Sequence, residues 1–342
     1  MTASLDATYS VGRNLSGVGV YSRELSLHLA QAHPECRFLH CFRPHKFLRG
    51  IRLDRPANAS ARLLLDSWPI RAGVFHGLNQ RMPEWRAHRA VSTFHDLFVL
   101  TSDYSTPEFR ARFAAQARHA AERSDLIICV SQHTASIVAG VLNVEGSRLR
   151  VVPHGVRFSE SATEARRERV VLHVGAIQKR KNLIRLVEAF EAACPQDWRL
   201  VLAGSNGFGA EEVMARIEAS RARERIVLTG WVDDAQILGW YQRASIFAFP
   251  SLDEGFGIPV LEAMALGVPV IASSRSSLPE VCGGAALMVD ALETESIAAA
   301  LKQLTEDAAL RTELAQRGCE RAMEFTWEQA AALTWDVYQE LA

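Results

Sequence analysis

The 342-residue chain has few cysteines and no arrangement that would use them together. No Cys-x-x-Cys pair and no cysteine–histidine spacing of a metal site occurs among the six, which are Cys36, Cys41, Cys129, Cys194, Cys282 and Cys319. No apolar run approaches the roughly 18 residues needed to cross a bilayer, and the first residues lack the pattern of a signal peptide. We therefore expect a cytoplasmic protein without a disulfide framework, either soluble or peripherally bound to a membrane.

The chain also has almost no net charge, but its charges are unevenly distributed. The formal charge is -1, while residues 1–160 hold 20 Lys and Arg against 13 Asp and Glu. The first half is therefore basic and the second half acidic, which suits a phosphate-bearing acceptor or an anionic membrane surface near the first half. Arginine-rich helices that only contact water would give the same count. We expect no nucleic-acid partner.

The length and the 48% apolar content predict two domains, each with a sizeable core. Short apolar runs alternate with helical stretches, which is typical of α/β domains with parallel, doubly wound sheets. The strands expected in the first half are Ser4–Asp6, Cys36–Cys41, Val74–His76, Ala90–Phe94, Leu126–Val130 and Leu149–Val152. Those expected in the second half are Val170–Val174, Arg199–Ala203, Ile226–Thr229, Ile246–Phe249, Val268–Ala272 and Ala286–Val289. The polar stretch Arg157–Arg169 between the two sets is typical of a linker.

Residues 247–273 form the most informative segment. Phe247–Pro250 has the length and composition of a buried strand, and Pro259 suits the first turn of a helix that Gly267 would end. Val268–Ala272 follows as the next buried strand. The loop between the first strand and the helix therefore lies at the carboxyl edge of a parallel sheet, where ligands bind.

The residues of that loop indicate the kind of ligand. Gly255 and Gly257 allow the backbone to approach a ligand closely, and the free N–H groups at the helix start favour an anion such as a pyrophosphate. Glu254 and Glu262 are acceptors, which suit the hydroxyls of a ribose and a hexose better than a phosphate. Taken alone, the two glutamates would be ordinary surface acids.

The spacing of Glu254 and Glu262 within this frame resembles the family-4 retaining glycosyltransferases. Further segments follow in that family's order along nearly the whole chain: Gly17–Leu25, Phe94–Asp96, Val130–Ser131, Val152–Gly155, Val174–Asn182 and Gly230–Val232. The resemblance implies a GT-B fold, with two Rossmann-like domains that face each other across a cleft. The implied boundaries are 1–157 for the acceptor-side domain, 158–326 for the nucleotide-sugar domain, and 327–342 for a final helix that packs back on the first domain.

Arg180 and Lys181 are expected between a strand and the helix Leu183–Ala193. Cations placed there would stabilise the negative charge of a departing nucleoside diphosphate. The chain has no Asp-x-Asp motif of metal-dependent glycosyltransferases, and Asp233 and Asp234 are better explained as a cap for the next helix. We expect no metal and no cofactor.

Gly17 and Gly19 are expected in the loop before a helix at Tyr21–Ala30. They belong to an incomplete Gly-x-Gly-x-x-Gly, because Ser22 replaces the third glycine, so a dinucleotide site is only weakly indicated. The resemblance instead places this loop near the donor diphosphate. Tight-turn glycines without a ligand are the alternative.

The resemblance assigns the remaining donor contacts. His95 would bond a hydroxyl of the donor sugar, with Asp96 orienting its ring, and Val232 would lie where backbone groups read the nucleobase. Backbone N–H groups of Gly255, Phe256 and Gly257 would bind the diphosphate or sugar, Glu254 the sugar hydroxyls and Glu262 the ribose. We expect Glu254, His95, Arg180 and Lys181 to act in catalysis. His154 departs from the family's usual asparagine, which leaves any role of that turn open.

The function implied is metal-independent transfer of a hexose, with retention, to a saccharide or lipid-linked saccharide. The Gln-Lys-Arg-Lys-Asn spacing is most similar to the mannosyltransferase-rich branch, so GDP-mannose is the preferred donor and a UDP-hexose the alternative. Pro44–Arg55, which interleaves cations with apolar residues, is either a plain surface loop or a contact with an anionic bilayer at the inner face of the membrane.

Other functions on related folds stay open. A sugar-nucleotide epimerase and a pyridoxal-phosphate-dependent phosphorylase share the two-domain fold. An NAD-dependent oxidoreductase would need an acidic residue after the second strand, where Phe42 and Arg43 stand instead. A non-catalytic binding protein would not need the cations.

Overall fold

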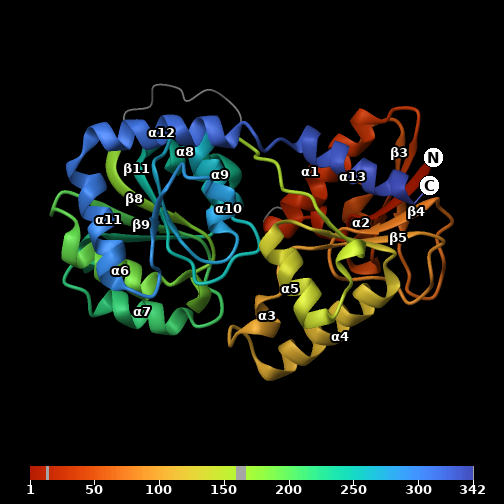
Figure 1. Cartoon of the computed structure of the whole chain (residues 1–342), viewed down its shortest axis with the longest axis horizontal. Helices are drawn as coiled ribbons and strands as arrows, with labels where there is room; N and C mark the ends of the chain where they lie inside the picture. Colours follow the sequence, from red (N-terminus) through yellow and green to blue (C-terminus); the bar gives the residue numbers. More distant parts are fainter. Residues whose placement is uncertain (13–14, 159–166, 342) are drawn as a thin grey trace. The chain divides into compact units, whose positions relative to one another are not determined.

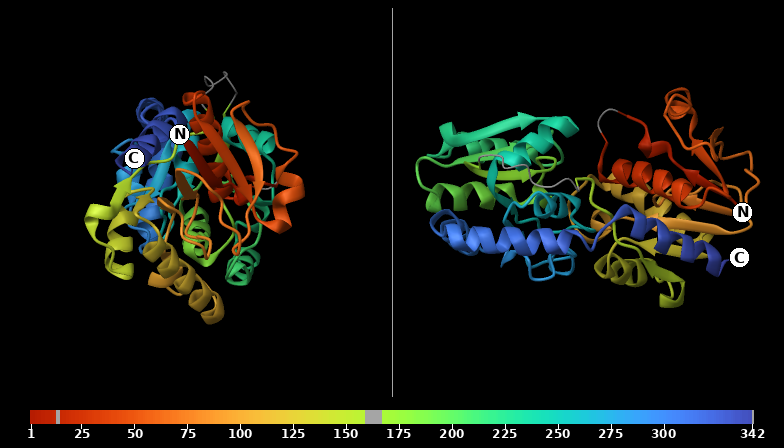
Figure 2. Two further views of the ribbon diagram at one scale, coloured as in Figure 1. Left: turned by 90° about the vertical axis from the view of Figure 1, so that its right-hand side faces the viewer. Right: turned by 90° about the horizontal axis from the view of Figure 1, so that it is seen from above.

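The computed structural model describes residues 1–12, 15–158 and 167–341 and divides the chain into two compact units. The first unit comprises Met1–Gly155 together with Phe325–Ala342, and the second comprises Val156–Glu324. Most of the stretch expected as a linker, residues 159–166, lies outside the described residues. Both ends of the chain belong to the first unit, as Figure 2 shows.

The first unit is built on a seven-stranded sheet in the order β3-β2-β1-β4-β5-β6-β7, with every pairing parallel. The strands are β1 Thr2–Asp6, β2 Arg37–Phe42, β3 Ala59–Leu63, β4 Val74–Gly77, β5 Ala90–Phe94, β6 Leu126–Cys129 and β7 Leu149–Val151. The helices are α1 Gly17–Ala32, α2 Pro44–Gly50, α3 Phe98–Thr101, α4 Pro107–Arg123, α5 Gln132–Leu142 and α13 Trp327–Glu340. Figure 1 labels these elements.

Successive residues of the strands supply two separate cores, one on each face of this sheet. Phe38 packs with α1 and α13, whereas its neighbour Leu39 packs with residues of α4 and α5. Side chains alternate across a strand, and a sheet covered on both faces needs apolar residues at consecutive positions. This explains why the inner strands are continuous apolar runs.

Helix α13 is attached to the sheet by a buried polar chain as well as by apolar packing. His76 Nδ1 lies 2.7 Å from the hydroxyl of Tyr338, and its Nε2 lies 2.8 Å from Thr93 Oγ1. Thr93 Oγ1 in turn lies 2.8 Å from the hydroxyl of Tyr21 in α1. The last helix is thus held to the first unit by a continuous chain of buried hydrogen bonds.

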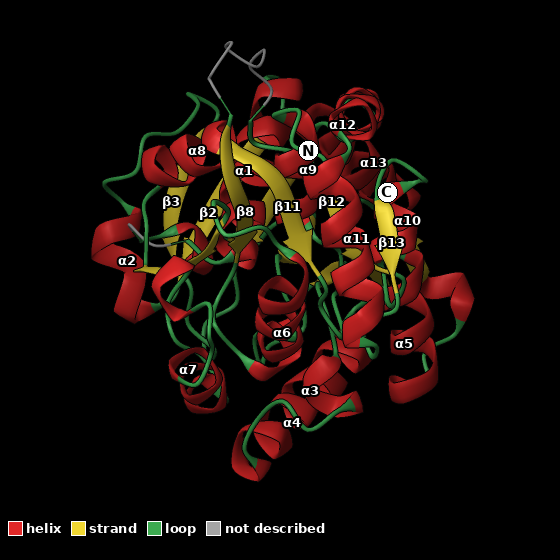
Figure 3. Ribbon diagram, turned by 90° about the vertical axis from the view of Figure 1, so that its left-hand side faces the viewer, coloured by secondary structure: helices red, strands yellow, loops and turns green. Residues whose placement is uncertain are grey.

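The second unit is built on a six-stranded parallel sheet in the order β10-β9-β8-β11-β12-β13. The strands are β8 Glu168–Val174, β9 Arg199–Ala203, β10 Ile226–Gly230, β11 Ala244–Phe249, β12 Val270–Ser273 and β13 Leu287–Val289. The helices are α6 Leu183–Ala193, α7 Ala210–Glu218, α8 Asp234–Arg243, α9 Ile258–Ala265, α10 Leu278–Cys282, α11 Thr294–Glu306 and α12 Ala308–Ala322. Figure 3 shows α6, α7 and α11 on one face of this sheet, with α8 and α9 on the other.

The expected pair of parallel, doubly wound sheets is confirmed, and each expected strand is present. The sequence did not indicate β3, an edge strand whose residues Ala59–Leu63 are only partly buried. Helix α1 also begins earlier than expected, at Gly17 rather than Tyr21. Ser16 is the reason, since its side chain accepts a hydrogen bond from Gly19 N and so caps the helix.

Gly155, at the end of the first unit's main segment, lies directly against the start of α13. A Cβ added at Gly155 would be 2.4 Å from Trp327 N and 2.6 Å from Trp327 Cγ. By contrast, an added Cβ at Gly140 in α5 would meet nothing within 4 Å.

We expect Gly155→Ala to lower the free energy of unfolding by about 1–3 kcal/mol, because the added methyl group overlaps a backbone atom. Gly140→Ala is the matched control, and it should raise stability by about 0.5–1 kcal/mol because alanine favours the helix. Urea denaturation of both variants measures the two changes. Equal stability of Gly155→Ala and the unmodified protein would contradict the close contact.

Candidate active site

The carboxyl edge of the second sheet places two loops side by side where the strand order reverses. Strands β8 and β11 are neighbours, yet β9 and β10 lie beyond β8 whereas β12 and β13 lie beyond β11. The loop after β8 leads through the 3₁₀ turn Lys179–Lys181 into α6, and the loop after β11 leads into α9. Such a switch point is the usual ligand site of a doubly wound sheet.

Glu254, from the loop after β11, lies between the two cations from the loop after β8. One of its carboxylate oxygens is 2.7 Å from Arg180 Nη1 and the other is 2.5 Å from Lys181 Nζ. All three side chains are nine-tenths buried. The structure therefore brings together three of the four residues expected to act in catalysis.

The charges of this cluster determine its protonation. Burial alone would raise the pKa of Glu254, but Arg180 and Lys181 outweigh it and lower the pKa to about 2. The carboxylate is ionised at neutral pH. Two buried cations meet it at this sheet edge, and cations placed there favour an anionic ligand.

Hydrogen bonds to backbone carbonyls hold the two loops together. Leu252 N donates to the carbonyl of Arg180 at 2.8 Å, and Arg180 Nη1 donates to the carbonyl of Asp253 at 2.5 Å. Asn182 Nδ2 donates to the carbonyls of Pro250 and Ala291 at 3.1 and 2.6 Å. No local pattern indicates this role of Asn182, because its partners lie 68 and 109 residues away.

The turn Gly255–Gly257 is supported from α10. Ser277 Oγ lies 2.9 Å from the carbonyl oxygens of both Glu254 and Phe256. Gly257 caps the start of α9 with a φ of 116°, a left-handed conformation that suits glycine. Pro259 lies in the first turn of α9, as expected, and Gly267 follows directly after the cap that ends the helix.

Glu262 lies in a second polar cluster, on α9. Its Oε1 accepts from Arg157 Nε at 2.7 Å, and its Oε2 accepts from the hydroxyl of Tyr241 at 3.1 Å. Arg157 also pairs with Asp234 at 2.8 Å. Burial raises the pKa of Glu262, while Arg157 opposes the increase. Arg157 was expected only as a linker residue, because nothing in its neighbourhood indicates a partner 105 positions away.

Val232 follows the end of β10 and is buried. The next residue, Asp233, accepts from Gln236 N at 2.9 Å and forms a capping box at the start of α8, as expected. This capping role leaves the Asp233 side chain engaged with the helix.

Across the described residues, no three His, Cys, Asp or Glu side chains gather as a metal ion would require.

Gly17 and Gly19 lie in the first turn of α1, which corrects their expected place in a loop before the helix. A Cβ at Gly19 would be 2.8 Å from the carbonyl oxygen of Tyr9, so this position requires glycine for close packing. Both glycines still belong to the helix that starts at the carboxyl edge of the first sheet. Contact with a donor stays a prediction for both.

His95 follows β5 at the same edge of the first sheet and is buried. Its Nε2 donates to the carbonyl of Leu78 at 2.9 Å, so the ring is oriented by a carbonyl that the sequence did not indicate. Its ring stacks on His154, with centroids 5.3 Å apart and an angle of 16° between planes. Burial lowers the pKa of His95 to about 4, so the ring is neutral at pH 7.

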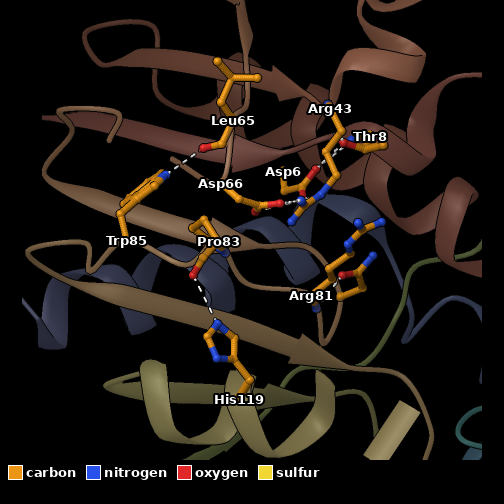
Figure 4. A network of polar contacts seen from close by, with 10 residues as sticks. Asp6, Thr8, Arg43, Leu65, Asp66, Arg81, Pro83, Trp85 and His119 are labelled. Carbon is orange, nitrogen blue, oxygen red and sulfur yellow. Dashed lines mark hydrogen bonds and ion pairs between the residues drawn. The ribbon is translucent and has the colours of Figure 1, made fainter. Parts of the chain in front are cut away.

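A further polar network at this edge, drawn in Figure 4, was not expected from the sequence. Asp6, at the end of β1, accepts from Thr8 N at 3.1 Å and lies 3.5 Å from Arg43 Nε. Arg43 Nη1 donates to both oxygens of Asp66, at 2.9 and 3.0 Å. In the sequence, Arg43 was noted only because it stands where an NAD-binding site would need an acidic residue. In the structure, it joins β1 and α2 to the loop after β3 through Asp6 and Asp66.

Two family matches cover most of the chain. Residues 15–160 match Glycosyltransferase Family 4, and residues 157–321 match Glycosyl transferases group 1. The chain belongs to the family-4 glycosyltransferases. This family-4 glycosyltransferase resembles the O-antigen chain mannosyltransferase B of Escherichia coli, at 29% identity over 97% of this chain and 98% of that protein.

Solved structures agree on the fold of the glycosyltransferase. Sucrose-phosphate synthase from Thermosynechococcus elongatus superposes with a TM-score of 0.82 at 20% identity, covering 100% of this chain and 99% of that one. The Anabaena protein HepE, in complex with UDP and glucose, superposes with a TM-score of 0.72 at 17% identity, covering 99% and 98%. The expected GT-B fold class is confirmed. No helix in the described ranges is long and apolar enough to span a membrane.

The Glu254 cluster makes the stability of the glycosyltransferase depend on this carboxylate. Glu254→Gln removes the carboxylate that pairs with two buried cations, so we expect it to lower the free energy of unfolding by about 3 kcal/mol at pH 7. Because the folded pKa lies below the ordinary 4.5, the stabilisation is complete above pH 4.5 and is lost as the pH falls toward 2. The difference between variant and unmodified protein should therefore shrink in acid.

Denaturant titrations between pH 7 and pH 3.5 measure this difference. Glu306→Gln, on the exposed side of α11, is the control and should change stability by less than about 0.5 kcal/mol. A Glu254→Gln protein as stable as the unmodified one at pH 7 would show that the two cations do not need the carboxylate.

Proposed function

We propose that the protein transfers a hexose from a nucleotide sugar to a saccharide or lipid-linked saccharide, with retention of anomeric configuration and without a metal ion. The observation that carries the proposal is the buried group of Arg180, Lys181 and Glu254 at the switch point of the second sheet. It offers positive charge to a diphosphate and an acceptor to sugar hydroxyls in one place. The protein is proposed to need no cofactor.

The cations supply the main catalytic effect. When the bond between the anomeric carbon and the diphosphate oxygen breaks, negative charge develops on the leaving oxygen. Arg180 and Lys181 are already desolvated and held by backbone and side-chain contacts, so little reorganisation is needed to stabilise that charge. The loop after β8 would thus play the part that a divalent ion plays in metal-dependent enzymes.

No protein nucleophile is assigned. The low pKa of Glu254 makes its carboxylate a weak base, and both of its oxygens are engaged by cations. We therefore favour attack of the acceptor hydroxyl on the face that the diphosphate leaves. The new bond from the anomeric carbon to the acceptor oxygen forms as the old bond breaks, and the acceptor proton passes to the leaving phosphate oxygen.

His95 is proposed to accept a hydrogen bond from a hydroxyl of the donor sugar. Because Nε2 donates to the carbonyl of Leu78, that nitrogen carries the proton and Nδ1 is left as an acceptor. The lowered pKa keeps the ring neutral, so Nδ1 stays available over the physiological range. Gly17 and Gly19, at the start of α1, are proposed to approach the diphosphate.

The nucleoside is assigned to the remaining groups of the second unit. Glu262 is proposed to hold the ribose hydroxyls, with Arg157 and Tyr241 fixing its carboxylate. Val232 is proposed to present backbone groups to the base, and the N–H groups of Gly255, Phe256 and Gly257 to bind the diphosphate or sugar.

GDP-mannose is the proposed donor, supported by the similarity to a mannosyltransferase of O-antigen chains over nearly the full length. That relative also supports a growing polysaccharide as acceptor. A UDP-hexose is the alternative, because backbone groups near Val232 do not distinguish guanine from uracil, and the similarly folded HepE binds UDP and glucose.

A thermal-shift panel of GDP-mannose, GDP, UDP-glucose and UDP identifies the donor, because a ligand that binds only the folded state raises the melting temperature.

With that donor, Arg180→Ala should lower kcat about 100- to 1000-fold, because one group that stabilises the charge of the leaving diphosphate is lost. Transfer should continue in EDTA, and the product should keep the donor's anomeric configuration.

Lys179→Ala is the matched control, since Lys179 is exposed and adjacent in sequence to Arg180. It should change kcat less than about threefold, within the range of a surface substitution. If Arg180→Ala transferred the hexose at the normal rate, the proposed role of the cluster would be wrong.

We also propose that the protein works at the inner face of the membrane, where α2 and the following segment contact anionic lipid. Leu48 of α2 is 70% exposed, and Arg49 and Arg52 beside it in the sequence are exposed as well. Trp68, in the loop after β3, is 73% exposed. Apolar side chains that enter the headgroup region and cations that meet anionic lipid together suit a peripheral contact.

Flotation with vesicles that contain phosphatidylglycerol should recover the protein, and vesicles of phosphatidylcholine alone should not. The double variant Arg49→Glu and Arg52→Glu should weaken binding to the anionic vesicles by more than about tenfold, given about 1 kcal/mol for each cation near the surface. The double variant Arg112→Glu and Arg118→Glu, at exposed positions of α4, makes the same change in net charge and is the control. Absence of flotation with anionic vesicles would remove the membrane proposal.

A further inference from the structure

His173 is a fully buried residue of β8 to which the proposed transfer assigns no role. It lies two residues before Gly175, where the chain leaves β8 toward Arg180 and Lys181. Its position therefore places an imidazole beneath the cations of the candidate site.

The hydrogen bonding of His173 determines its tautomer. Nδ1 lies 3.0 Å from the carbonyl oxygen of Ala248, which can only accept, so Nδ1 carries the proton. Nε2 is then an acceptor. Burial is the largest cause of a pKa near 3, with Lys181 lowering it further, so the ring is neutral at pH 7.

Nε2 has no hydrogen-bond partner among the described residues, although it is buried. A buried acceptor without a partner is unfavourable, and a native structure rarely keeps one unless it is used in another state. The ring is held in place, because it stacks on Phe249 with centroids 5.4 Å apart and an angle of 17°.

Lys181 is the donor next to this acceptor. The point where a Cβ of Gly175 would lie is 3.5 Å from His173 Nε2 and 3.6 Å from Lys181 Nζ, so the two nitrogens flank the same glycine. Lys181 Nζ also lies over the ring of Phe249, 4.4 Å from its centroid. Phe249 and Gly175 are thus shared by the imidazole and the ammonium group.

Glu254 holds Lys181 in the present arrangement, at 2.5 Å. The proposed function requires this carboxylate to accept sugar hydroxyls once the donor binds, which weakens its hold on the ammonium group. An ammonium group has three donors, and a lysine stem is flexible unless several partners hold its end.

We propose that His173 is a positioning residue for Lys181, whose ammonium group donates to Nε2 of His173 when the nucleotide sugar occupies the site. The imidazole then keeps Lys181 directed at the leaving diphosphate after Glu254 turns to the sugar. This inference rests on the proposed function only through the role of Lys181. A side chain at Gly175 would crowd this contact, because its Cβ would lie within 3.6 Å of both nitrogens.

The test is a double-mutant cycle that combines His173→Phe with Lys181→Met, with kcat, KM and melting temperature measured for the donor found in the thermal-shift panel. Phenylalanine keeps the stack on Phe249 and removes the acceptor, and methionine keeps most of the lysine stem. His173→Phe alone should lower kcat about 10- to 100-fold, the range of one hydrogen bond to a charged group. KM should change less than about threefold, and the melting temperature should not fall.

The decisive comparison is His173→Phe in a protein that lacks the ammonium group of Lys181. In the Lys181→Met background, His173→Phe should change kcat less than about twofold, because its only route to the reaction has been removed. His173→Gln, which keeps an acceptor, should recover part of the lost rate.

Three results would overturn the inference. A normal kcat in His173→Phe together with a large loss in Lys181→Met would leave the proposed function standing and remove His173 from it. An equal loss in both backgrounds would show that His173 acts independently of Lys181. A normal kcat in Lys181→Met would overturn both this inference and the assigned role of Lys181.

Discussion

A buried carboxylate held between two cations is the constraint on which the second unit depends. Arg180 and Lys181 come from the loop after β8, and Glu254 comes from the loop after β11. Desolvated charges of either sign are costly alone, so the two loops stabilise each other at the point where the strand order reverses. The two cations that help to stabilise this edge also prepare it for an anion.

Neutral imidazoles are the second recurrent feature of the molecule. His95 and His173 each donate to a backbone carbonyl through one nitrogen, which leaves the other nitrogen as an acceptor. Burial is the main cause of the low pKa of both rings. Each sheet edge therefore carries an acceptor that does not change charge near neutral pH and that can serve a hydroxyl or ammonium donor.

The sequence was sufficient for features that depend on neighbouring residues. The inner strands, the helix start at Pro259 and the Asp233 cap were all expected, because burial on both faces and capping leave local patterns. Strand β3 was missed because an edge strand that is half exposed needs no apolar run. The start of α1 was misplaced because two glycines suggested a loop, whereas the cap at Ser16 decided the outcome.

Pairings between distant residues could not be predicted. Arg157 with Glu262, and Asn182 with Ala291, join positions more than 100 residues apart, and no local pattern encodes either partner. His173 was predicted only to lie in the strand Val170–Val174, without a role of its own. The family resemblance supplied residue types for the site, but the second layer that holds those residues depends on how the sheet brings the loops together.

The contact between Gly155 and Trp327 has a consequence for the architecture of the chain. The first unit consists of two segments, and they meet where the first segment stops and the second begins. In topological terms, the second unit is an insertion into a loop of the first, with its two attachment points adjoining. A fold of this kind can gain, lose or exchange the inserted module without having to reroute the host's own chain.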